Sequence, residues 1–219
     1  MSNLSGRWKF GLLLAASTAF MWGVLPIALK GLMSTLDPMT TTFFRFFIAA
    51  VLITPYLLAR KKLVNKNKFC SVKLSLQLLC AGFLLTANYA LYIFGLERSS
   101  PEAAQVMMQL APVLLLLAGV WIFKEQFTPF QWCGFAIFIG GLVLFFSPRF
   151  DDVFVSLNGY GEGLILLILA AVTWVGYAII QKFLLRDFNA EETMLVFYWI
   201  GALAFLPFSN FETLPDLTS

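Results

Sequence analysis

The sequence contains no histidine. Histidine is the commonest general acid or base and the commonest transition-metal ligand in proteins, so its absence argues against most hydrolytic and metal-dependent chemistry. The three cysteines, Cys70, Cys80 and Cys133, lie far apart without CxxC spacing, which indicates neither a zinc site nor a disulfide framework. We therefore expect no catalytic residues, no bound metal and no cofactor.

Charged side chains are also scarce. They make up 12% of the 219 residues, while 60% are hydrophobic, against roughly 25% and about 45–50% in a soluble domain. So few polar groups cannot cover the surface of a globule in water, which excludes a soluble protein of this size. No basic run is interleaved with aromatic side chains, so we expect no nucleic-acid partner.

Seven apolar segments follow one another, each near the length of a membrane span. They cover Phe10–Met33, Met39–Ala59, Leu74–Leu96, Glu102–Phe123, Pro129–Ser147, Gly161–Leu185 and Thr193–Phe208. Backbone groups in lipid need internal partners, and runs of about 20 residues are too long for barrel strands. The sequence therefore predicts an all-α multi-pass membrane protein with about seven transmembrane helices.

The first segment resembles a cleavable signal peptide at its start, where Arg7 and Lys9 precede an apolar run. The run continues through Leu29, however, which is longer than the apolar core of a signal peptide. We expect it to be retained as the first span.

The positive charges predict the orientation of the spans. With the N-terminus inside, the outer side receives only Lys30, Arg98 and Arg149. The inner side then receives Arg7, Lys9, Arg60, Lys61, Lys62, Lys66, Lys68, Lys73, Lys124, Lys182 and Arg186. Because short cytoplasmic loops carry the excess of lysine and arginine, we expect a cytoplasmic N-terminus in a bacterial-type inner membrane.

The start of the chain repeats later at an offset of 152 residues. Trp22 matches Trp174, Lys30 matches Lys182, and Pro55 matches Pro207. Five spans separate the two copies, and because five is odd the copies are inverted in the membrane. We expect a five-helix repeat at 10–147 and a partial second repeat of two helices at 161–219. Inverted repeats of this kind are typical of secondary transporters.

Several motifs carry a resemblance to a known family. They are Phe44-Arg-Phe, Gly95-Leu-Glu-Arg-Ser-Ser-Pro-Glu-Ala-Ala, Leu110-Ala-Pro-Val, Phe123-Lys-Glu-Gln-Phe-Thr-Pro-Phe-Gln-Trp-Cys-Gly and Gly140-Gly141. With them the chain resembles the drug/metabolite transporter superfamily, EamA type. The resemblance implies ten spans in two inverted five-helix repeats, and export or exchange of amino acids, nucleotides, drugs or other metabolites. Against that pattern we expect three spans to be missing, either because the chain is a fragment or because the gene product is truncated.

A transporter binds its substrate among polar and aromatic side chains deep in the membrane. We predict a site made of Trp22, Asn88, Tyr92, Gln105, Gln109, Trp174 and Tyr177. Spacings of four place Asn88 with Tyr92, and Gln105 with Gln109, on common helix faces. Trp174 and Tyr177 lie in the repeat copy of the helix that holds Trp22.

Each of these assignments has a structural alternative. The bend expected near Pro26 can be a packing kink, and buried amides can serve as hydrogen bonds between helices. Arg45 is the only cation well inside a span, and we favour a structural or gating role for it over direct substrate binding. No Asp or Glu lies deeper in the predicted spans than their first turns, so proton coupling through an intramembrane carboxylate is unsupported.

The predicted function is a permease that moves a small organic metabolite, such as an amino acid or drug-like solute, by alternating access. The solute and the lipid bilayer are its expected partners, and no oligomeric state is predicted. A retinal protein needs a lysine in its last span, which 193–208 lacks, and an intramembrane enzyme needs histidines or paired carboxylates. A non-transporting fragment of such a permease remains the alternative.

Overall fold

The computed structural model of the protein describes residues 8–60, 71–124, 126, 128–149 and 159–212. These residues form helices joined by short turns, and no β-strand occurs in the described ranges. Seven of the helical stretches are long and apolar enough to cross a membrane. The prediction of an all-α multi-pass protein with about seven spans is confirmed.

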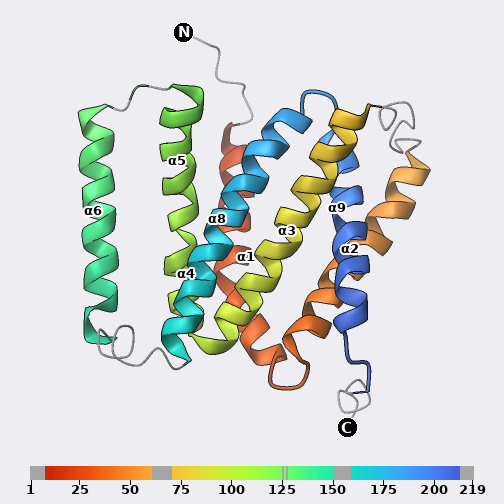
Figure 1. The fold of residues 1–219 in the computed structure, drawn as a ribbon, viewed down its shortest axis with the longest axis horizontal. Coiled ribbons are helices and arrows are strands. Elements are labelled where there is room, and N and C mark those ends of the chain that lie inside the picture. Colours follow the sequence, from red (N-terminus) through yellow and green to blue (C-terminus); the bar gives the residue numbers. More distant parts are fainter. Residues whose placement is uncertain (1–7, 61–70, 125, 127, 150–158, 213–219) are drawn as a thin grey trace.

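The helices pass back and forth between two ends of the molecule (Figure 1). They are α1 (Trp8–Leu32), α2 (Pro38–Ala59), α3 (Val72–Arg98), α4 (Pro101–Met108), α5 (Leu110–Phe123), α6 (Pro129–Phe146), α8 (Tyr160–Leu184) and α9 (Ala190–Phe205), with the short 3₁₀ helices η2 (Ser147–Arg149) and η3 (Leu206–Phe208). Helices α1 and α8 run in opposite directions, and α9 ends at the opposite end of the molecule from the start of α1 (Figure 1).

Three helices begin at a polar cap that is followed directly by proline. The side chains of Asp37, Ser100 and Thr128 accept hydrogen bonds from backbone N–H groups at the starts of α2, α4 and α6. Proline suits the next position because the first helical N–H has no partner within the helix. These starts lie within one residue of the predicted ones.

Helix α9 begins three residues earlier than predicted. Asn189 and Glu192 form a capping box, in which each side chain accepts from the backbone N–H at the other position. The apolar run on which the prediction depended starts only at Thr193, so it omitted this polar first turn.

The predicted fourth span is interrupted at Gln109, where α4 ends and α5 begins. Two local features accompany the interruption. Pro112 has no N–H, so the carbonyl of Met108 lacks its usual helical donor. The N–H of Gln109 bonds to the carbonyl of Val106, three residues earlier, at 3.1 Å. The two helices together still form one span, Pro101–Ile122.

The centre of the fold is the packing of α3 against α8, which is the most extensive contact between helices (Figure 1). Gly95 and Gly163 face each other there, because a Cβ built on Gly163 would lie 3.0 Å from the Gly95 carbonyl oxygen. Close backbone approach at small residues is how helices pack in membranes, where burial of apolar side chains supplies little net driving force. Helix α9 packs on both α2 and α3.

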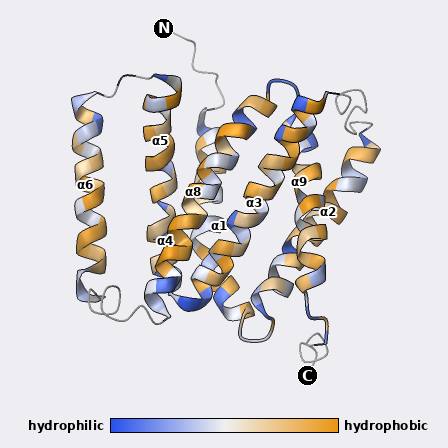
Figure 2. Ribbon diagram, in the orientation of Figure 1, coloured by the Kyte–Doolittle hydropathy of each residue, from blue (hydrophilic) through white to orange (hydrophobic). Residues whose placement is uncertain are grey.

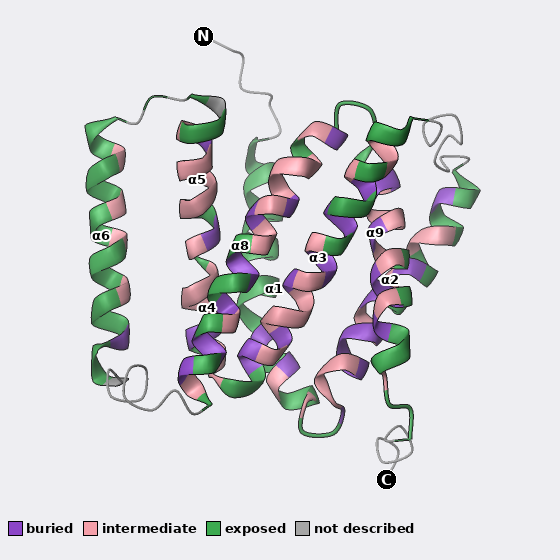
Figure 3. Cartoon of the chain, viewed as in Figure 1, coloured by how far each residue is buried: buried purple, intermediate pink, exposed green. Residues whose placement is uncertain are grey.

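The outside of the bundle is apolar along most of its length, while hydrophilic residues gather toward the helix ends (Figure 2). Large side chains such as Trp121 and Phe130 are 78% and 88% exposed. Helix α6 is exposed along most of its length, whereas buried residues concentrate on α3, α8 and α9 (Figure 3). An exposed apolar surface of this extent is expected of a protein that contacts lipid.

Candidate functional site

A cavity of about 350 Å³ lies where six of the helices converge. Its lining residues come from α1, α2, α3, α4, α8 and α9. They are Trp22, Leu25, Arg45, Leu85, Asn88, Tyr89, Tyr92, Gln105, Met108, Trp174, Tyr177, Gln181, Met194 and Tyr198. Six of the seven residues predicted from the sequence are therefore brought together around one cavity.

Helical periodicity explains how the lining is built. Helix α3 contributes Leu85, Asn88, Tyr89 and Tyr92, a spacing of three, four and seven that forms one stripe along the helix. Helices α1, α4 and α9 each contribute a pair and α8 a triplet with spacings of three or four, while α2 contributes Arg45 alone. The cavity thus forms where polar or aromatic faces of several helices meet at the same depth in the bundle.

Helix α1 is connected to the site through a carbonyl that proline leaves free. Pro26 lacks the N–H that would bond to the carbonyl of Trp22, four residues earlier. Gln105 Nε2 donates to this oxygen at 2.6 Å. Helix α1 continues through Pro26 without a break, so the freed carbonyl is satisfied by the neighbouring helix.

Asn88 connects α3 to α8 and also lines the cavity. Its side chain is 5% exposed, and its Nδ2 donates to the carbonyl of Ala170 at 2.7 Å. Asn88 therefore holds two helices together with one end of its amide, as expected of a buried amide in a membrane protein. The same residue forms part of the cavity lining.

Aromatic side chains form much of the remaining lining. Tyr177 is buried and packs edge to face on Phe197, with ring centroids 5.6 Å apart. Trp174 packs into the cores on both sides of α8. Trp22 is 55% exposed, which places it on an open side of the cavity.

Gln109 is exposed and does not line the cavity. Gln105 lines the cavity and Gln109 does not, so the structure does not bring both amides to the site. We therefore leave Gln109 out of the proposed site. It becomes a useful control, because it carries the same side chain four residues from Gln105.

Arg45 was considered from the sequence but not placed in the site, and the structure places it in the cavity lining. Its guanidinium carbon lies 4.7 Å from the centroid of the Tyr89 ring, in cation–π contact. A second cation in the spans, Lys30, is placed differently. Its ammonium donates to the carbonyls of Leu96, Glu97 and Ser99 at 2.6–2.9 Å, where the end of α3 leaves carbonyls without helical partners.

Sequence reasoning missed several lining residues, among them Gln181, Met194 and Tyr198. Their spacing in the sequence was a signal that could have found them. Gln181 follows Tyr177 by four residues and Tyr198 follows Met194 by four, so each pair shares a helix face. The faces could be read from the sequence, but which of them point toward one another depends on how the helices pack.

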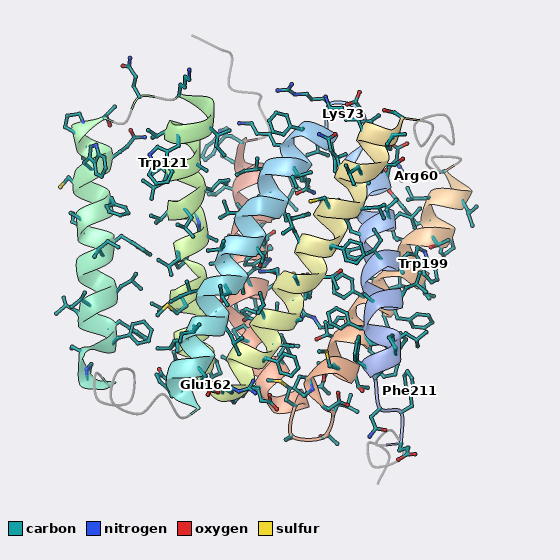
Figure 4. The ribbon with its side chains drawn as sticks, viewed as in Figure 1. Arg60, Lys73, Trp121, Glu162, Trp199 and Phe211 are labelled. Atoms are coloured by element: carbon teal, nitrogen blue, oxygen red, sulfur yellow. The ribbon has the colours of Figure 1, made fainter. Side chains whose placement is uncertain are left out.

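The charged ends of the molecule differ. Arg60 and Lys73 lie at the end where α1 begins, and Glu162 lies at the opposite end (Figure 4). Near that opposite end Arg98 forms an ion pair with Glu162 at 3.7 Å.

Comparison with known proteins shows which family the sequence resembles. Residues 9–147 match the model of the EamA-like transporter family. An uncharacterized transporter of Haemophilus influenzae is 37% identical over 209 residues, which cover 95% of this chain and 67% of that protein. The uncharacterized inner membrane transporter YhbE of Escherichia coli is 34% identical over 200 residues, 91% of this chain and 62% of that protein.

A more distant relative carries a substrate in its name. The S-adenosylmethionine uptake transporter of Rickettsia prowazekii is 25% identical over 176 residues, which cover 80% of this chain and 54% of that protein. The chain spans about two thirds or less of the length of these relatives. From its match to the family model and its seven apolar helices, the chain belongs to the EamA-like transporter family and is a multi-pass membrane protein.

Proposed function

We propose that the chain forms the solute-binding part of a secondary transporter, which moves small organic metabolites such as amino acids or drug-like solutes by alternating access. The observation that carries the proposal is the cavity of about 350 Å³ between six apolar helices, lined by aromatic and amide side chains. Small-molecule sites are concave and mostly apolar, with a few polar groups that orient the ligand. The cavity has this character.

Two features of the fold support the proposal that helices move around this cavity during transport. Helices α1 and α8 run in opposite directions (Figure 1), as an inverted repeat requires. Outside the last third of α1, few of its residues are buried. We propose that 10–147 and 161–219 are the two inverted units of the sequence repeat, and that α1 moves relative to α3 and α8 when access changes.

We also propose that the N-terminus lies in the cytoplasm of a bacterial-type cell. Arg60 and Lys73, which lie at the end where α1 begins (Figure 4), support this orientation. The name of the Rickettsia relative supports a small organic solute as substrate without identifying the solute for this chain.

The test is solute release from liposomes that contain the purified full chain. Vesicles are loaded with a bacterial metabolite extract, diluted, and the released solutes are identified by mass spectrometry. We expect at least one organic solute to leave faster than from protein-free liposomes. Gln105→Ala should slow its release because Gln105 positions α1 at the cavity, and Gln109→Ala should not.

Reconstituted amounts are matched for all three proteins. Release no faster than from protein-free liposomes would contradict a transport function. Equal loss in both variants would contradict the assignment of the cavity as the solute site.

A further inference from the structure

Arg45 carries the only formal charge among the described residues that line the cavity. It lies seven residues into α2 from Pro38, about 10 Å along the helix axis. The other lining side chains are apolar, aromatic or uncharged amides. The cavity therefore has a net positive charge within a membrane-spanning bundle.

The guanidinium of Arg45, on a half-buried residue, is only partly satisfied by the described part of the protein. One of its terminal nitrogens is buried and has no hydrogen-bond partner. The Tyr89 ring compensates the charge in part, but an aromatic face is a poor substitute for a hydrogen-bond acceptor. No ion pair joins Arg45 to any residue that the structure describes, and the described acidic residues lie at helix ends or in turns.

Lys30 shows that this fold can satisfy a cation in a span with its own backbone. Three carbonyl oxygens accept from that ammonium. Among the described residues, no comparable set of carbonyl oxygens accepts from Arg45. Guanidinium groups stay protonated in proteins, and an unpaired charge buried away from water is costly. The cost of the unpaired Arg45 charge at the cavity wall is offset if a bound ligand supplies the partner.

We infer that Arg45 binds the anionic group of the solute, and that the solute is a monocarboxylate with an aromatic or otherwise apolar body. The inference rests on the proposed function of the cavity. A guanidinium presents two parallel N–H donors that match the two oxygens of a carboxylate.

A carboxylate suits the site better than a phosphate monoester. A phosphate ester carries about −1.5 to −2 charges at neutral pH, and the described lining offers a single positive charge. A carboxylate is neutralised by one guanidinium. The rest of the solute would contact Trp22, Trp174 and Tyr177, with flexible side chains at Met108 and Met194.

The test compares three probes that share one aromatic body: 1-naphthaleneacetate, the neutral 1-naphthaleneacetamide and 1-naphthyl phosphate. Binding to the full chain in lipid nanodiscs is measured by calorimetry. The variants are Arg45→Gln and, as a matched control, Arg60→Gln. Arg60 is the residue that caps the C-terminal end of α2 and also stacks on a tyrosine, with its guanidinium 4.9 Å from the Tyr56 ring, but it is exposed and outside the cavity.

We expect the wild-type protein to bind the carboxylate about ten- to a hundred-fold more tightly than the amide, the range for a charge-assisted hydrogen-bonded pair. Arg45→Gln should abolish this preference, so that the carboxylate and the amide bind with similar affinity. Arg60→Gln should keep the preference. The phosphate should bind more weakly than the carboxylate.

Equal affinity of the wild-type protein for acid and amide would overturn the inference while leaving the cavity as a solute site, and this comparison needs no variant to fold. Tighter binding of the phosphate would overturn the choice of carboxylate. Preference for the acid that persists in Arg45→Gln would overturn the role of Arg45. Saturable binding of none of the three probes would count against the proposed function itself.

Discussion

Lys30 and Arg45 differ in how many hydrogen-bond partners the protein gives to their charged groups. The sequence identifies Lys30 and Arg45 as cations in or near spans, but it cannot distinguish them. The structure does, because Lys30 reaches the free carbonyls at the end of α3 and Arg45 faces the cavity. The carbonyl left free by Pro26 was predictable from the sequence; its partner, Gln105, was not, because that contact depends on the packing of α1 against α4.

Lys30 is expected to hold the end of α1 to the turn between α3 and α4. Lys30→Met should reduce the stability of the purified protein by about 1–3 kcal/mol, the range for hydrogen bonds from a charged group. Thermal unfolding in detergent measures the change. Lys9→Met, near the exposed start of the same helix, should unfold at the wild-type temperature. A Lys30→Met protein that unfolds like wild type would show that the three bonds contribute nothing net.

Among the elements, apolar length and polar caps predicted the helices well. Departures occur where a local rule overrides the apolar pattern. The capping box extends α9 by three residues, and Pro112 contributes to the interruption at Gln109. Gln109 stands at that interruption and is exposed, outside the cavity lining, although its spacing from Gln105 is that of one helix face.

The contact between α3 and α8 is expected to depend on its glycines. Gly163→Leu should destabilise the protein by about 1–3 kcal/mol, because overpacking forces neighbours apart. The added Cβ would lie 3.0 Å from both the Gly95 carbonyl oxygen and the Arg98 Cβ. Gly140→Leu on α6 is the control, since a Cβ there meets nothing within 4 Å. Thermal unfolding that is equally lowered in both variants would contradict close packing at Gly163.

The whole molecule has two chemically different ends, and the sequence already predicts which faces the cytoplasm. Lys73→Cys and Glu162→Cys, placed singly in a variant with its three cysteines replaced by serine, mark the two ends (Figure 4). An impermeant thiol reagent added to intact cells should label Glu162→Cys at once. Lys73→Cys should be labelled only after the membrane is opened. The reverse pattern would contradict the proposed orientation.

At the scale of the whole molecule, the family and the number of spans follow from motifs and apolar runs, and six of seven predicted site residues line one cavity. The convergence of α2 and α9 on that cavity was not predictable. Arg45, Met194 and Tyr198 become part of the site only through the packing of these two helices on α3.

The central claim is that a cavity open to aqueous solutes lies among the apolar helices. The most direct test is the reaction of Met108→Cys, in the same cysteine-free background, with a small anionic methanethiosulfonate in proteoliposomes. Ile48→Cys is the control, because Ile48 lies near the middle of α2 and is 53% exposed on the apolar exterior. We predict rapid modification of Met108→Cys and none of Ile48→Cys. Failure of Met108→Cys to react, or equal reaction at both positions, would contradict the cavity.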